Sequence, residues 1–142
     1  MDGITFVRRI RDEGVEYPPI GSFVGFVLTK IEKGSLEAVG TPTAAHYNPL
    51  GVVHGGFSST LMDLALGLVS VTVLPSMDHG VTTTDLNLRY VRPITETTGP
   101  MTVVASVLHA GKRIVVAEAS LRDENHKLYT LAQSTLLVVA RR

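Results

Sequence analysis

The chain has 142 residues, 44% of them hydrophobic, which is enough to bury one core and indicates a single domain over residues 1–142. Its 13 Lys and Arg balance its 13 Asp and Glu, so net charge favours neither nucleic acid nor an anionic membrane as a partner. The absence of cysteine excludes disulfides, a thiolate nucleophile and thiolate metal sites, and is compatible with a reducing cytoplasm.

The N-terminal segment, residues 1–20, lacks the apolar run and cleavage site of a signal peptide, so we expect a cytoplasmic protein. Apolar residues at helical spacing predict a short surface helix over residues 3–12, which two prolines then end. β-Branched and aromatic residues predict two strands next, over residues 22–31 and 35–47, joined by a turn at Gly34.

One long helix is predicted in the middle of the chain. Apolar residues recur at intervals of three and four after Gly56, and the pattern continues to about Leu74 before Pro75 ends it. Asp63 is its one charged residue. An ionised carboxylate among apolar residues needs solvent or hydrogen bonds, so we expect Asp63 to open into a cavity, where it would suit a base. The alternative is that Asp63 lies on an exposed face or accepts from a backbone amide.

Four further strands are predicted after the helix and are expected to be antiparallel neighbours. They cover residues 80–93, 100–111, 112–124 and 127–140. A single apolar helix followed by consecutive strands indicates an α+β fold, in which a curved antiparallel sheet wraps around one long central helix.

Three features occur together: "NPLGVVHGG", the helix with Asp63, and "TTTDLNLRYVRP". Together they resemble the hotdog-fold acyl-CoA thioesterases of the phenylacetate-degradation (PaaI-like) type, from about Ser22 to the end of the chain. The resemblance implies hydrolysis of an aryl- or medium-chain acyl-CoA thioester to free acid and CoA. It implies no cofactor, because coenzyme A is part of the substrate. It also implies at least a homodimer, commonly paired into a homotetramer, with no nucleic acid or membrane partner.

In this resemblance Asp63 is the general base or the direct nucleophile. A helix N-terminus offers unpaired N–H groups and a partial positive charge, which suit the oxyanion of a thioester transition state. The resemblance assigns this role to the Gly55 N–H and places Gly56 beside the substrate. The alternative is that both glycines only permit a tight turn before the helix.

Asn48, His54 and Thr83 complete the catalytic set that the resemblance implies. Asn48 would orient the thioester or the attacking water, or else be an ordinary loop residue. A histidine could serve as a general base, but the resemblance gives His54 loop-holding hydrogen bonds rather than base catalysis. Thr83, within the run of three threonines, would hold the catalytic water. Alternation along one continuous strand puts Thr83 on the face opposite Leu88, so its access depends on local twist or a dimer partner.

The acyl pocket is expected to be lined by Phe57 and Leu61. Four cations near predicted strand ends are candidates for the CoA phosphates, which Arg and Lys bind well, or else are solvated surface residues. They are Arg89, Arg92, Lys112 and Arg113. The five histidines show no metal-ligand spacing, so no metal is expected.

The resemblance also implies that one subunit supplies Asn48 and the Gly55 N–H, while its partner supplies Asp63 and Thr83.

Two other functions stay open. A hotdog hydroxyacyl-thioester dehydratase would carry its catalytic His in a Phe-Pro-Gly context, which "VVHGGF" does not match. A non-catalytic acyl-CoA-binding protein is the other alternative. "GGFSST" is not the G-x-S-x-G nucleophile elbow, so serine hydrolase chemistry is not expected.

Overall fold

The computed structural model describes residues 1–14 and 18–142, so part of the predicted N-terminal segment, residues 1–20, lies outside the described residues. Its α-helices are α1 (Gly3–Asp12) and α2 (Gly55–Val71), and neither is long and apolar enough to cross a membrane. Short 3-10 turns are η1 (Pro19–Val24), η2 (Ala44–His46) and η3 (Glu96–Thr98). The strands are β1 (Val27–Glu32), β2 (Ser35–Gly40), β3 (His79–Thr83), β4 (Asn87–Tyr90), β5 (Met101–Ala110), β6 (Ile114–Arg122) and β7 (Leu128–Ala140).

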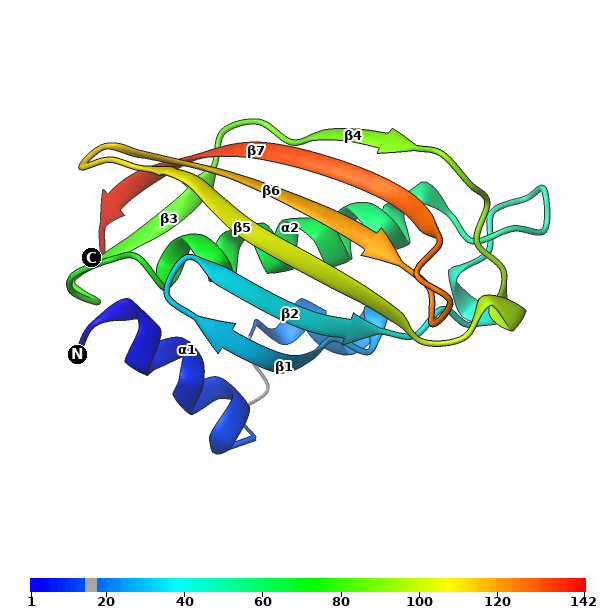
Figure 1. Cartoon of the computed structure of the whole chain (residues 1–142), viewed down its shortest axis with the longest axis horizontal. Coiled ribbons are helices and arrows are strands. Elements are labelled where there is room, and N and C mark those ends of the chain that lie inside the picture. The colour runs from blue at the N-terminus through cyan, green and yellow to red at the C-terminus, as the bar shows by residue number, and fades with distance from the viewer. Residues whose placement is uncertain (15–17) are drawn as a thin grey trace.

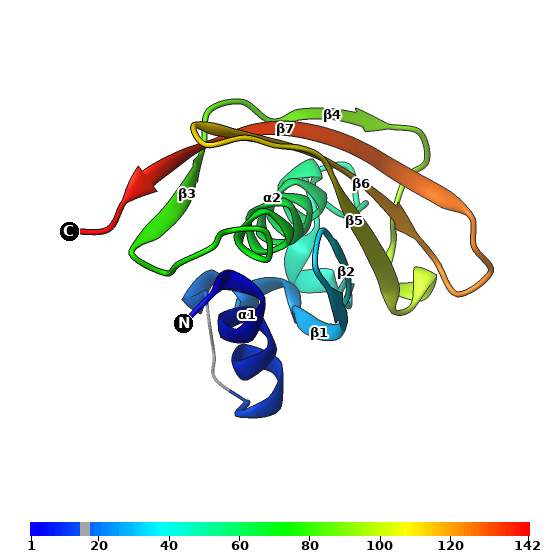
Figure 2. The same ribbon diagram turned by 60° about the vertical axis from the view of Figure 1, so that its left-hand side comes forward.

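The seven strands form one antiparallel sheet in the order β1-β2-β5-β6-β7-β3, and β4 also pairs with β7. The sheet curls, and α2 lies along its concave face (Figure 1). Figure 2 shows α2 nearly end-on, with strands on several sides of it and α1 below it near β1. This confirms the predicted curved antiparallel sheet around one central helix.

The core lies between α2 and the concave face of the sheet. Alternate residues of β5 point into it, and Met101, Val103 and Ala105 are fully buried. Leu61 of α2 packs against β2 at Gly40, where a β-carbon would lie only 2.8 Å from the Leu61 methyl carbons. The glycine therefore lets the sheet approach the helix closely.

The two N-terminal strands are shorter than predicted. Residues 19–24 form η1, and Gly25 follows in the left-handed conformation with φ of 61°, so β1 begins only at Val27. β2 ends at Gly40 rather than at residue 47, because Pro42 has no N–H to continue the ladder and η2 follows. The turn between the two strands lies at the predicted Gly34, with φ of 79°.

The prediction that successive C-terminal strands are neighbours is right for β5, β6 and β7 but wrong for the strands before them. β4 pairs with β7, while β5 pairs with β2. The connection of residues 91–100 is longer than a hairpin turn, and it carries the chain across the end of the sheet.

The predicted strand over residues 80–93 is in fact two strands separated by a bulge. β3 pairs through Thr83 with Leu136, whereas β4 pairs through Asn87 with Gln133. Between these two pairs, the segment that joins β3 to β4 therefore contains one residue more than the facing segment of β7. An extra residue reverses the alternation of side chains, so Thr83 faces α2 while Asn87 faces outward.

The turn between β6 and β7 is fixed by a carboxylate. Asp123 accepts hydrogen bonds from the backbone N–H of Asn125 at 2.8 Å, the N–H of Lys127 at 3.0 Å and the hydroxyl of Tyr129 at 3.0 Å. Burial works to raise the pKa of Asp123, but the hydrogen bonds to its ionised form outweigh burial and hold the pKa below its ordinary value.

We predict that the fold loses stability in acid as the Asp123 carboxylate becomes protonated. Because its folded pKa lies below an unfolded value of about 3.9, its stabilising contribution is complete above that value and is lost as the pH falls through the folded pKa. Urea unfolding of the wild type and Asp123→Asn checks this. The wild type should exceed the variant in unfolding free energy by more at pH 7 than at pH 3. Equal differences at both pH values would contradict the prediction.

Candidate active site

A cavity of about 510 Å³ opens beside Asp63, where α2 meets α1, β3 and the end of β7. Its walls are mainly apolar and include Phe6, Ile20, Leu64, Leu68, Val81 and Leu136. The partly exposed Asp63 and the hydroxyl-bearing Thr83 also line it. A carboxylate beside an apolar cavity is the arrangement that the sequence predicts for Asp63.

Thr83 reaches Asp63 because of the bulge after β3. Its Oγ1 donates a hydrogen bond to Asp63 Oδ1 at 2.8 Å. The bulge is held on β7 by its own side chains: Thr84 Oγ1 donates to the Thr135 carbonyl at 2.8 Å, and Asp85 Oδ1 accepts from the Thr135 N–H at 2.7 Å. The assumption of one continuous strand, which put Thr83 on the face opposite Leu88, is therefore wrong.

The first turn of α2 leaves one backbone donor unpaired among the described residues. The N–H of His54 donates to the His46 carbonyl at 2.7 Å, that of Gly56 to His54 Nδ1 at 2.9 Å, and that of Phe57 to the His54 carbonyl at 2.9 Å. The N–H of Gly55 has no such partner and lies at the positive end of the helix dipole. It can therefore donate to an anionic oxygen.

Tyr90 of β4 covers this glycine, although the sequence analysis did not single it out. Its hydroxyl donates to the Gly55 carbonyl at 2.9 Å, and a β-carbon at position 55 would lie 3.2 Å from the Tyr90 ring. Both residues line a cavity of about 330 Å³ at the start of α2, together with Ser58 and Arg92. The alternation along β4, which places Tyr90 on the same face as Leu88, is the signal that could have found it.

Asn48 closes the loop before α2. Its Oδ1 accepts from the N–H of Leu50 at 2.9 Å and from that of Val52 at 3.3 Å, and its own N–H donates to the Val52 carbonyl at 2.7 Å. These bonds match the loop-residue alternative. The side-chain amide N–H groups have no partner among residues 1–14 and 18–142, so they are the part of Asn48 that a substrate could meet.

His54 is the N-cap of α2. Because its Nδ1 accepts the hydrogen bond of the Gly56 N–H, the proton of the neutral ring belongs on Nε2. The same loop is held by His46, whose Nδ1 accepts from the Thr43 N–H at 2.9 Å and whose Nε2 contacts the Phe23 carbonyl. His54 thus has the loop-holding position that the resemblance implies, while its catalytic role stays a prediction.

Phe57 and Leu61 lie in the core rather than against the cavity beside Asp63. Their exposed fractions are 3% and 0%, and neither lines that cavity. Helix positions i and i+2 are about 200° apart around the axis, so Leu61 and Asp63 point to nearly opposite sides of α2. The wall of α2 beside Asp63 consists instead of Leu64, Gly67, Leu68 and Val71, and a place for Phe57 and Leu61 in the acyl pocket stays a prediction.

The four predicted phosphate-binding cations are not brought together within one chain. Arg92 follows β4 and lies 5.7 Å from the centre of the Tyr129 ring, whereas Lys112 and Arg113 form the turn between β5 and β6 at the other end of the sheet (Figure 1). β4 ends opposite Thr130 and β6 begins opposite Leu137, so the two ends lie about 23 Å apart along β7.

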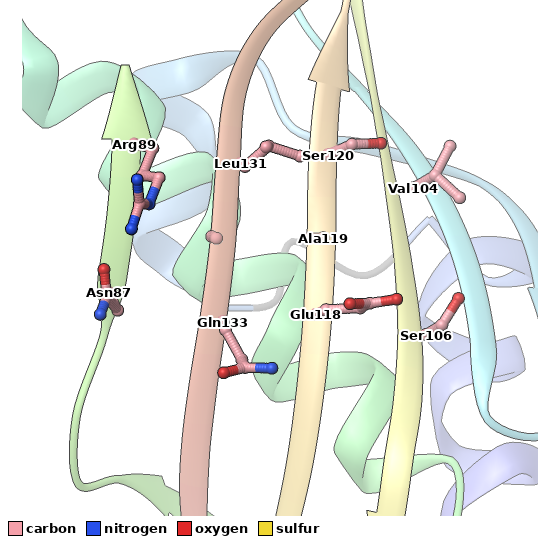
Figure 3. Close-up of a pocket in the computed structure, with 10 residues that line it drawn as sticks. Asn87, Arg89, Val104, Ser106, Glu118, Ala119, Ser120, Leu131 and Gln133 are labelled. Carbon is pink, nitrogen blue, oxygen red and sulfur yellow. The ribbon is translucent and has the colours of Figure 1, made fainter. Parts of the chain in front are cut away.

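Arg89 lies in a different hollow, on the convex face of the sheet. Figure 3 shows Arg89 and Asn87 on β4 facing the same side of the sheet as Gln133 of β7 and Glu118 of β6, with α2 behind the strands. This hollow has a volume of about 520 Å³, similar to the cavity beside Asp63. The sheet separates it from Asp63, so we place the candidate active site on the concave side.

The predicted oxyanion donor and the carboxylate lie far apart within one chain. Gly55 and Asp63 are eight residues apart on α2, which corresponds to about 12 Å along the helix axis. They also face different cavities, one beside Tyr90 and the other beside Thr83. One thioester carbonyl therefore cannot contact both groups of the same chain.

Within the described part of the chain, no three His, Asp or Glu side chains cluster as a metal site.

Comparison with known proteins identifies the family. A family model described as the thioesterase superfamily matches residues 50–130, more than half of the chain, so the chain belongs to this superfamily. Several matched relatives and solved structures are themselves named thioesterases. Together with the curled sheet and central helix, this confirms the hotdog-fold thioesterase class and an enzyme of the thioester hydrolase type.

Individual proteins support the same class. A "Putative esterase" of Saccharolobus solfataricus is 32% identical over 127 residues, covering 89% of this chain and 82% of the relative. A 1,4-dihydroxy-2-naphthoyl-CoA hydrolase of Listeria monocytogenes is 26% identical over 119 residues, covering 84% and 94%. The PaaI protein of Escherichia coli, from the phenylacetic acid degradation operon, has a TM-score of 0.83 over 96% of both chains. At 18% identity, this last likeness concerns the fold.

The Asp63–Thr83 contact yields a prediction that separates neighbouring threonines. Thr83→Val removes the hydroxyl and keeps the side-chain shape, so kcat for thioester hydrolysis should fall about 10- to 100-fold with little change in KM. Thr82→Val is the matched control, because Thr82 is exposed on the other face of β3 and should retain activity. Equal kinetics of the two variants would contradict a role for Thr83.

Proposed function

We propose that the protein hydrolyses an acyl-CoA thioester with an aryl or medium-chain acyl group to the free acid and CoA. The observation that carries this proposal is the Asp63 carboxylate, held by Thr83 at 2.8 Å in the wall of an otherwise mainly apolar cavity. The cavity offers apolar surface for an acyl group and one acceptor at the point where the thioester would react. A relative that hydrolyses a naphthoyl-CoA lends support to an aryl substrate.

Asp63 supplies the reactive oxygen. One carboxylate oxygen accepts from Thr83, and the other has no hydrogen bond among the described residues, so it can bind and deprotonate a water. Attack of that water on the thioester carbonyl expels the CoA thiolate. Direct attack by the carboxylate, which would form an acyl-enzyme anhydride that water then cleaves, uses the same geometry. The Thr83 hydroxyl fixes the carboxylate's orientation in either route.

The Gly55 N–H donates a hydrogen bond to the carbonyl oxygen as negative charge develops on that oxygen. A donor that is fixed before the reaction stabilises the transition state more than the ground state. His54 contributes by capping the helix through Gly56, and Tyr90 by holding the Gly55 carbonyl. Asn48 is assigned to the acyl group or the water through its free amide N–H groups. All four cations, Arg89, Arg92, Lys112 and Arg113, stay predicted contacts of the CoA phosphates.

A homodimer brings the two halves of the site together. β3 is the last strand in the order of the sheet, and within the described part of the chain no strand pairs with its outer edge, so backbone groups there are available to another strand. Pairing of β3 with β3 of a second copy by a two-fold axis would extend the sheet. Asp63 and Thr83 of one chain would then face the start of α2 in the other. We further propose that two dimers form a tetramer and that the enzyme acts in the cytoplasm.

Asp63→Asn should abolish turnover and leave the fold intact, because it preserves the side-chain volume and the Thr83 contact but removes the base. Release of CoA from aryl-acetyl, benzoyl and straight-chain acyl-CoAs measures this, with an expected loss of at least about 1,000-fold in kcat. Asp78→Asn is a matched control, because among the described residues that exposed carboxylate accepts a hydrogen bond from Ser76 alone. Turnover retained by Asp63→Asn would refute the assignment. Stoichiometric acyl-CoA binding without turnover by the wild type would indicate a binding protein.

A further inference from the structure

Arg141 lies in the cavity that holds Asp63. Among the residues that line this cavity, Asp63 and Arg141 are the two that carry charge, and most of the others are apolar. The mechanism uses Asp63 but gives no role to Arg141. A cation in the wall of an acyl-binding cavity bears on which acyl groups the cavity accepts.

Three contacts hold Arg141 in place. Its backbone N–H donates to the Asp78 carbonyl at 2.8 Å, which fixes the chain beyond the end of β7. Its side chain runs along β3, where a β-carbon at Gly80 would lie 3.6 Å from Arg141 Nε. Its guanidinium carbon lies 5.3 Å from the centre of the Phe6 ring, which is another wall of the cavity. Gly80 therefore leaves room for the arginine against the strand.

No ion pair within residues 1–14 and 18–142 includes Arg141. Arg141 is exposed to solvent, and its guanidinium presents several N–H donors in a planar array that suits a carboxylate. The cavity thus has a negative group where the thioester reacts and an unpaired positive group elsewhere in its wall.

The distance between the two charges can be estimated along β3. Thr83 touches Asp63, while Arg141 touches Gly80, three residues earlier in the same strand. At about 3.3 Å per residue, the two positions are separated by roughly 10 Å. An extended acyl chain of about eight carbons, with carbon–carbon bonds of about 1.5 Å, spans a similar length.

We propose that Arg141 selects acyl groups that carry a carboxylate at the end remote from the thioester, namely CoA monothioesters of dicarboxylic acids of about eight carbons. This inference rests on the proposed acyl-CoA hydrolysis. The apolar walls bind the methylene chain, and the guanidinium binds the terminal carboxylate. Repulsion by Asp63 disfavours the reverse orientation, so the thioester is presented to the base.

Hydrolysis of octanoyl-CoA and of the CoA monothioester of octanedioic acid tests the proposal. The wild type should have a lower KM for the carboxylated substrate. Arg141→Gln should raise that KM about tenfold with kcat nearly unchanged, and should change the KM for octanoyl-CoA by much less. Arg141→Lys should restore part of the preference. Arg142→Gln is the matched control, because it removes the next cation along the chain, which does not line the cavity.

Binding of both substrates to Asp63→Asn, measured by calorimetry, separates this inference from the proposed function. A preference for the carboxylated substrate that Arg141→Gln abolishes in this background supports the inference even if the wild type shows no turnover. Turnover of both substrates with a ratio that is the same in wild type and Arg141→Gln overturns the inference and leaves the hydrolase assignment standing. Binding of both substrates without an effect of Arg141 overturns it as well.

Discussion

The site depends on a single carboxylate placed in an otherwise uncharged helix. Burying Asp63 without a partner would cost several kcal/mol, so the fold must give it a hydrogen bond and access to solvent or ligand. The structure meets both needs, through the Thr83 hydroxyl at 2.8 Å and through the cavity between α2, α1 and β3. The helix can otherwise be apolar on nearly every side because the curled sheet encloses it. Asp63 is thus the point at which the buried helix opens to the cavity in which we propose that the acyl group binds.

The proposed oxyanion donor lies at the other end of the same helix. There the loop from Asn48 to His54 satisfies the backbone donors of the first turn, except for the N–H of Gly55. A rigid helix keeps Gly55 and Asp63 about 12 Å apart, so catalysis by both requires groups from two copies. The unpaired outer edge of β3, close to Asp63 and Thr83, offers the contact by which a second copy could supply them.

The sequence predicts the elements well, because strands β5 to β7 bury alternate side chains over much of their length and α2 is a long, nearly uncharged apolar segment that the sheet encloses. It fails at Thr83, where the direction of the side chain depends on a bulge that Thr84 and Asp85 stabilise by bonding to β7, fifty residues further along the chain. The contacts of Tyr90 with Gly55, and of Arg141 with the cavity, are likewise set by tertiary packing. The sequence pattern identifies residues that suit the chemistry, whereas strand pairing decides which of them meet.

The most direct test of the shared site uses heterodimers of two inactive chains. Asp63→Asn removes the base. Gly55→Pro removes the oxyanion N–H. The first turn of a helix tolerates proline, and the preceding residue, His54, has φ of −60° and ψ of 141°, which suit a following proline. Gly55→Ala controls for the carbon added near Tyr90. The two variants, co-expressed with different tags and purified as heterodimers, should recover about half of the wild-type turnover, because one of the two sites is intact. Heterodimers as inactive as both parents would show that the base and the oxyanion donor act within one chain, and would contradict the account.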